Sequence, residues 1–256
     1  MCLIFVAWRA VPDYPLVVAA NRDEFFARPT AVAGFWPEAP QVLAGRDLEA
    51  GGTWMGVTRG GRFAALTNYR DPAQMRAGLP SRGALVSGFL DSEGAAEDYL
   101  QQIAAVGQKC NGYNLLLGDG KELWWSSNVG GVSRKLAPGI YGVSNHLLDT
   151  PWPKVGAGKT ALSRVLDDLP GEQGLFDLLR DDSIHADEHL PQTGVPLEWE
   201  RLLSAAFVKS PAYGTRSSTV LVMQRDGSMS FDEQTWLPGA EPGPRRRYRF
   251  RATAMA

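Results

Sequence analysis

The chain has 256 residues, of which 44% are hydrophobic and 21% charged, the composition of a folded globular protein rather than a disordered one. Its formal net charge of -2 provides no global field to recruit nucleic acid or an anionic membrane surface. Two cysteines, Cys2 and Cys110, exclude a disulfide framework and favour a reducing, cytoplasmic location. Because we find no targeting segment and no apolar run of roughly 20 residues, we expect no integral membrane association.

The first half of the chain is predicted to be strands followed by helices. Apolar runs at residues 2–8 and 16–20, separated by turn-forming residues, predict a hairpin that holds the N-terminus in a sheet. Two further strands are expected at 54–58 and 62–67, then a loop over 69–80. The next segments, 83–90 and 94–106, are predicted to be helical.

The second half repeats this order. Strands are expected at 113–118, 122–126 and 139–144, helices at 158–169, 173–180 and 198–205, and final strands at 218–224 and 228–235. Strict alternation of strand and helix is missing. The order therefore predicts an α+β fold with antiparallel sheets and separate helical layers, built as a single domain over residues 1–256.

Cys2 is the first candidate for chemistry. If Met1 is removed, the thiol and the α-amine belong to one residue, and α-amines titrate at roughly pH 7.7–8.0, so the amine can act as a base. A nucleophile that uses its own amine is a known variant of the catalytic triad. The alternative is that Cys2 is only a small apolar strand residue, as buried cysteines often are.

The tetrapeptide Asn21-Arg22-Asp23-Glu24 forms a dense polar cluster directly after the second strand. Buried charges must be paired, and an arginine close to a thiol lowers its pKa and holds it as thiolate. A neighbouring aspartate would anchor the α-ammonium or orient the arginine. The alternative is a turn in which Asp23 caps a short helix over residues 24–27.

Three other polar residues lie at strand ends. Asn68 and Asn145 each follow an apolar run, where an amide can donate to a developing oxyanion, although each also suits a turn. Arg216 lies among small hydroxyl residues at the start of a late strand. It is a candidate second cation of the site, or else an edge-strand arginine exposed to solvent.

In combination these motifs resemble a known family. The Met-Cys start, the Asn-Arg-Asp-Glu tetrapeptide and the segment Tyr-Gly-Thr-Arg-Ser-Ser-Thr over 213–219 are similar to the NRDE proteins, also called the transport-and-Golgi-organisation family. The resemblance covers essentially the whole chain. That family in turn resembles the N-terminal-nucleophile (Ntn) hydrolases, which implies a four-layer αββα sandwich of two antiparallel sheets flanked by helices. The nearest analogy is the cysteine-type branch of choloylglycine hydrolases and penicillin V acylases.

The resemblance implies a cysteine amidohydrolase that cleaves a linear, non-peptide carbon–nitrogen bond without a cofactor. It assigns nucleophile and base to Cys2 and supporting roles to Arg22, Asp23, Asn68, Asn145 and Arg216. One departure from that branch concerns spacing, because its first arginine and aspartate are three residues apart, whereas here they are adjacent. If the strand register is kept, Asn21 takes the arginine position and Glu24 the aspartate position.

A second implication of the family is a link to intracellular haem movement. The alternative function is therefore a non-catalytic protein that binds or carries haem or another hydrophobic ligand. His146 is the candidate iron ligand, together with a Cys2 thiolate, and any haem would be non-covalent because no Cys-x-x-Cys-His motif exists. His185 and His189 suit an exposed helical face better than a metal site, and the basic segment 245–251 suits an alternating strand or exposed tail better than a nucleic-acid patch.

Overall fold

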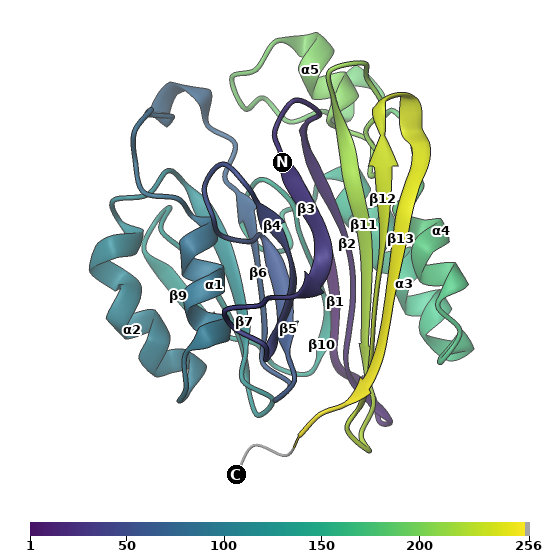
Figure 1. The fold of residues 1–256 in the computed structure, drawn as a ribbon. Helices are drawn as coiled ribbons and strands as arrows, with labels where there is room; N and C mark the ends of the chain where they lie inside the picture. The colour runs from purple at the N-terminus through teal and green to yellow at the C-terminus, as the bar shows by residue number, and fades with distance from the viewer. Residues whose placement is uncertain (254–256) are drawn as a thin grey trace.

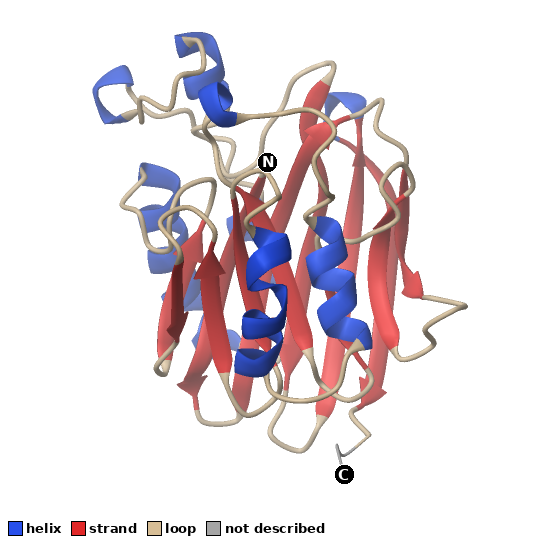
Figure 2. Ribbon diagram, turned by 90° about the vertical axis from the view of Figure 1, so that its left-hand side faces the viewer, coloured by secondary structure: helices blue, strands red, loops and turns tan. Residues whose placement is uncertain are grey.

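The computed structural model describes residues 1–253 as two antiparallel sheets packed face to face, with helices on both outer faces (Figures 1 and 2). This arrangement has the layer order helix, sheet, sheet, helix. It confirms the predicted α+β sandwich.

The first sheet has six strands and contains both ends of the described chain. Its spatial order is β10 (Gly139–Val143), β1 (Cys2–Val11), β2 (Tyr14–Phe25), β11 (Tyr213–Met223), β12 (Ser228–Leu237) and β13 (Glu241–Arg251). Each neighbouring pair is antiparallel. The N-terminal strand β1 therefore lies inside the sheet, between two partners, rather than at its edge.

The second sheet is a seven-stranded meander in which each strand pairs with the next along the chain. Its strands are β3 (Thr30–Phe35), β4 (Val42–Asp47), β5 (Met55–Thr58), β6 (Phe63–Asn68), β7 (Tyr113–Gly118), β8 (Leu123–Ser127) and β9 (Val132–Lys135). The chain makes this sheet between β2 and β10, so the second sheet is an insertion into the first.

Helices cover the outer face of each sheet. The helices α1 (Gly83–Asp91) and α2 (Ala96–Gly107) lie on the second sheet, and α3 (Pro153–Val165) and α4 (Gln173–Leu179) lie on the first. The short α5 (Leu197–Leu202) lies at the end of the sandwich where the N-terminus is found (Figure 1). Among residues 1–253, no helix combines the length and hydropathy that crossing a bilayer requires.

Strand alternation on β1 separates two apolar cores. Ile4, Val6 and Trp8 point to the opposite sheet, whereas Leu3 and Phe5 point to the helical layer of α3 and α4. Because side chains alternate, Cys2 lies on the inter-sheet face, at the end of the strand where the two sheets leave room for a cavity.

The structure decides between several alternatives that the sequence left open. The strand β2 extends to Phe25, so the alternative in which Asp23 caps a helix is wrong. The basic segment 245–251 lies within β13, which pairs along β12, so it is a strand and not a tail. The segment 187–189 forms only a short 3-10 turn, so His185 and His189 do not share a helical face.

Three strands escaped the sequence analysis for physical reasons. The strands β3 and β9 are the two edges of the second sheet: β9 is exposed along its length with Val132 as its one apolar residue, and the small apolar run of β3 is mostly only half-buried. The strand β4 buries only four small or apolar residues before it ends in a charged pair. Edge strands carry a weak hydrophobic pattern because one side of their ladder has no partner.

Candidate active site

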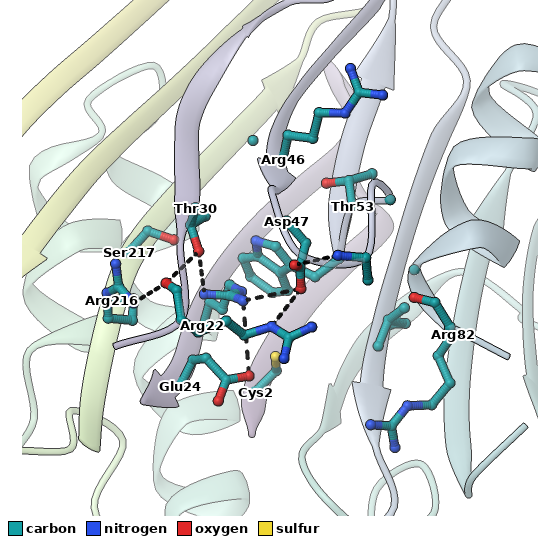
Figure 3. Close-up of a pocket in the computed structure, with 18 of the residues that line it drawn as sticks. Cys2, Arg22, Glu24, Thr30, Arg46, Asp47, Thr53, Arg82, Arg216 and Ser217 are labelled. Atoms are coloured by element: carbon teal, nitrogen blue, oxygen red, sulfur yellow. Dashed lines mark hydrogen bonds and ion pairs between the residues drawn. The ribbon is translucent and has the colours of Figure 1, made fainter. Parts of the chain in front are cut away.

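A cavity of about 300 Å³ opens between the two sheets at the N-terminal end of β1 (Figure 3). Its wall combines residues from both sheets and from the segment that precedes α1. Among its lining residues are Cys2, Arg22, Asn68, Arg82, Arg216 and Glu233. The structure therefore brings five of the predicted site residues, Cys2, Arg22, Asp23, Asn68 and Arg216, to one cavity.

Arg22 lies directly across the β1–β2 ladder from Cys2, and their Cα atoms are register partners. Both side chains point into the cavity. The guanidinium of Arg22 is 3.9 Å from a carboxylate oxygen of Glu24 and 3.9 Å from one of Asp47, and its Nη1 is 3.5 Å from Thr30 Oγ1 (Figure 3). These long contacts hold Arg22 near the thiol without neutralising it in a tight ion pair.

Asn21 and Asp23 point to the other face of the sheet, toward the helical layer. The Nδ2 atom of Asn21 donates to the carbonyl oxygens of Leu179 at 2.7 Å and Ala206 at 2.8 Å. The Oδ1 atom of Asp23 accepts a hydrogen bond of 2.8 Å from Thr215 Oγ1. Asn21 therefore does not take the arginine position. The side chain of Asp23 points to the face of the sheet opposite the one that carries the Cys2 thiol.

The main-chain atoms of Asp23 instead hold the N-terminus. The ammonium of Met1 donates to Asp23 O and, at 2.7 Å, to the hydroxyl of Tyr213, while Asp23 N donates to Met1 O at 2.7 Å. With Met1 in place, Cys2 is not the terminal residue. Burial raises the pKa of Asp23, against the opposing effect of the ammonium, and Asp23 Oδ2 has no hydrogen-bond partner among the described residues.

The Cys2 thiol is protonated in this environment. Burial raises its pKa to about 11, because a thiolate loses its hydration there, while the N-terminal ammonium and Arg22 lower the pKa by a smaller amount. The prediction that Arg22 holds Cys2 as a thiolate is therefore wrong for the chain that carries Met1. A nucleophilic Cys2 needs a base that removes its proton during attack.

The two predicted oxyanion residues have different positions. Asn68 lines the cavity. Asn145 is fully buried and does not line it, and its Nδ2 donates to Asn68 O at 2.9 Å. Ser144 Oγ lies 3.3 Å from both Cys2 O and Asn145 Oδ1. Asn145 thus connects the end of β6 to the start of β1 from behind the cavity.

Arg216 sits at a β-bulge between Thr215 and Ser217, which turns its side chain into the cavity rather than along the ladder. Its Nη1 donates to the carbonyl oxygens of Phe25 at 2.9 Å and Arg28 at 3.1 Å. The strand β11 lies inside the sheet, so the alternative of a solvent-exposed edge arginine is wrong.

Sequence reasoning missed several further charged groups in the cavity wall, among them Arg82 and Glu233. Arg82, just before α1, donates from Nη1 to Gly112 O at 3.0 Å; burial lowers its pKa, whereas the nearby Cys2 raises it. Glu233 on β12 is buried, accepts from Ala33 N at 2.8 Å, and has a pKa raised by that burial. No local motif marks either residue, because each reaches the cavity only through the packing of the two sheets.

His146, the candidate iron ligand, is not part of the cavity wall. Its Nδ1 is 2.9 Å from Thr150 Oγ1, and its ring packs 4.9 Å from that of Tyr69 and 6.0 Å from that of Trp152. The two residues proposed as haem ligands, Cys2 and His146, therefore do not meet at one site. Among residues 1–253 there is also no group of three or more His, Cys, Asp or Glu side chains arranged to hold a metal ion.

Sequence comparison identifies a family and several relatives of this chain. The sequence profile described as "Transport and Golgi organisation 2" matches residues 1–238. The Transport and Golgi organization protein 2 homolog of Bos taurus is 36% identical over 94% of this chain and 95% of its own length. The Homo sapiens homolog is 35% identical over 93% and 94%, and the Drosophila melanogaster protein is 29% identical over 94% of each chain.

Among solved structures, this chain is similar to the Caenorhabditis elegans ortholog of N-acylethanolamine-hydrolyzing acid amidase. The TM-score is 0.52, with 86% of this chain and 92% of that chain covered, at 12% sequence identity. At this identity the likeness concerns the fold alone, and it agrees with an Ntn-hydrolase-like sandwich. Because the sequence profile and the relatives both span nearly the whole chain, the protein belongs to the Transport and Golgi organisation 2 family.

Proposed function

We propose that the protein is a cysteine hydrolase of the N-terminal-nucleophile type, acting on a linear amide through Cys2, as in the choloylglycine hydrolase and penicillin V acylase branch. The observation that carries this proposal is the placement of the Cys2 thiol. It faces a cavity, directly opposite Arg22, at the point where the N-terminus is held in the sheet. A cysteine that served only to pack the core would need neither the cavity nor the arginine.

The mechanism requires removal of Met1, after which the backbone nitrogen of Cys2 becomes an α-amine. As the sulfur attacks the amide carbonyl carbon, the thiol proton passes to this amine. The carbonyl oxygen becomes an oxyanion, which the Asn68 amide at the cavity wall would stabilise. The amine then protonates the leaving nitrogen, the carbon–nitrogen bond breaks, and a thioester with Cys2 remains.

Water completes the reaction. The α-amine takes a proton from the water as its oxygen attacks the thioester carbon, and the thiol is regenerated with release of a carboxylic acid. Arg22 assists because its charge lowers the pKa of the thiol. The side chain of Asp23 lies on the other face of the strand. Its backbone oxygen and the hydroxyl of Tyr213 bind the ammonium group of Met1.

The rival proposal is a carrier of haem or another hydrophobic ligand in the same cavity. The residues do not favour haem, since His146 lies outside the cavity wall and the Cys2 thiol is protonated near neutral pH. A thiol that is protonated before attack is compatible with the hydrolase mechanism, in which the α-amine accepts the thiol proton. We therefore place the hydrolase first.

The test begins with intact-mass measurement, to select protein from which Met1 has been removed. This protein is mixed with p-nitrophenyl acetate and with a panel of N-acyl amides, and acyl-enzyme is sought by mass. We expect an adduct of one acyl group on Cys2 that is lost in Cys2→Ala and retained in Cys110→Ala. Cys110 is the matched control because it is the other cysteine, is buried in the cluster that includes residues of α1 and α2, and does not line this cavity. Full turnover by Cys2→Ala would overturn the proposal.

A further inference from the structure

Met1 occupies an apolar recess at the end of the sandwich. Its side chain packs against a cluster of the buried residues Leu203, Val208 and Tyr213, against which the partly buried Trp199 and Leu202 also pack. The ring of Trp199 meets that of Tyr213 edge to face at 5.3 Å, which forms one wall. Met1 also lines the cavity that holds the Cys2 thiol. Loss of Met1 would therefore leave an apolar recess that opens into the cavity.

We propose that this recess is the subsite for the leaving amine of the substrate, and that it selects a primary amine with an unbranched apolar chain of about the length of methionine. The inference rests on the proposed hydrolase function and adds to it the identity of one half of the substrate.

The chemistry of the leaving step fixes where this half must lie. The α-amine of Cys2 has to protonate the leaving nitrogen, so the two nitrogens must come within roughly 3 Å of each other. In the intact chain the group attached to the Cys2 nitrogen is the carbonyl of Met1. The space next to the future α-amine is therefore the space that Met1 fills, and the chain of the leaving amine enters the same recess.

The polar atoms of the recess are those that an amine needs. The Met1 ammonium donates to Asp23 O and to Tyr213 Oη at 2.7 Å, and both acceptors lose their donor when Met1 is removed. The Asp23 carboxyl, whose buried Oδ2 has no hydrogen-bond partner among the described residues, is close enough for the Met1 ammonium to lower its pKa, so it attracts a cation held in the recess. A primary ammonium with an alkyl chain reproduces both the charge and the shape of Met1.

The thiol side of the cavity is more polar than the recess. Arg22, Arg82 and Arg216 line it together with the carboxylates of Glu24, Asp47 and Glu233. An alkyl chain is therefore better accommodated on the Met1 side, and the acyl half of the substrate lies on the thiol side.

The experiment measures binding of n-alkylamines, from ethylamine to octylamine, to protein shown by intact mass to lack Met1. We expect affinity to rise about fourfold for each added methylene and to level off near pentylamine, whose chain matches the methionine side chain. Protein that retains Met1 is expected to show no such rise. An affinity independent of chain length, or equal with Met1 present, would overturn the inference.

A matched pair of variants locates the site. Leu202→Trp fills the recess and is expected to abolish the dependence on chain length, whereas Leu197→Trp, on the exposed side of α5, is expected to keep it. Acylation of Cys2 by p-nitrophenyl acetate separates the two proposals. An acyl adduct without alkylamine selectivity contradicts the recess alone, while selectivity without any adduct contradicts the hydrolase and leaves the recess as an amine-binding site.

Discussion

Cys2 and Arg22 are direct partners in the β1–β2 ladder, and both side chains point into the same cavity. The pairing follows from the hairpin register, which also places Asn21 and Asp23 on the opposite face. Strand register, rather than the spacing of the motif, therefore decides which member of the tetrapeptide meets the thiol.

Replacement of Arg22 tests this relationship. Arg22 lowers the pKa of the Cys2 thiol, so Arg22→Met should raise the pKa further and slow alkylation by iodoacetamide at pH 8, roughly tenfold if the shift is about one pH unit. Alkylation should accelerate as the pH approaches about 11. Arg46→Met is the control, because Arg46 is paired with Glu38 at the rim. Equal alkylation rates in the two variants would contradict the assignment.

The buried pair of Arg70 and Glu200 is expected to be essential for stability. Their atoms are 2.6 Å apart, and Glu200 also accepts from Thr193, so the pair joins the end of β6 to α5 beside the recess. Arg70→Met leaves a buried carboxylate without its cation, which should cost about 3–5 kcal/mol of unfolding free energy. The double variant with Glu200→Gln should recover much of the loss in urea titrations; no recovery would mean that the loss reflects packing.

Glu233 should make stability depend on pH. Burial raises the pKa of Glu233 in the folded state above its value in the unfolded state. The stability that the protonated carboxyl contributes is therefore fully present below the unfolded pKa and is lost as the pH rises through the folded pKa. Glu233→Gln keeps an acceptor for Ala33 N without the charge. We expect the variant and the parent to unfold alike near pH 4, and the variant to be the more stable at pH 8, by roughly 1 kcal/mol. A gap independent of pH would refute this.

Two glycines on α3 provide a packing test. A Cβ atom at Gly158 would overlap the ring of Phe5, whereas one at Gly156 meets no atom within 4 Å. Gly158→Ala should therefore destabilise the protein by about 1–3 kcal/mol, because it forces α3 away from β1. Gly156→Ala should stabilise it by up to about 1 kcal/mol through helix propensity. Thermal unfolding of both variants measures this difference in stability. Equal stabilities would mean that α3 does not pack closely on Phe5.

Much of the fold could be predicted from the sequence, because buried strands and helices carry a clear hydrophobic pattern. The strand β7 was predicted with the bounds that the structure shows, and α1 differs by one residue at its end. The helix α3 begins five residues earlier than expected because Pro153 occupies its first turn, where a proline is well tolerated.

The candidate site was only partly predictable, since motifs specify residues but not the face on which they lie. Cys2, Arg22, Asp23, Asn68 and Arg216 all line the cavity, as expected from the resemblance, although the Asp23 side chain points to the other face of the strand. Arg82 and Glu233 enter the cavity from segments far from these motifs in the sequence. The raised pKa of Cys2 also depends on burial, and burial is set by the packing of two sheets rather than by any neighbouring residue.

The enclosed position of Met1 has a practical consequence for reagents. A purification tag or fluorescent protein fused ahead of Met1 would have to displace the contacts of Met1 with Tyr213 and its cluster, and would keep Cys2 from becoming a chain terminus. Fusions of that kind should report a misleading absence of activity. Labels for imaging or capture are better attached after β13, which ends at the opposite end of the sandwich (Figure 1).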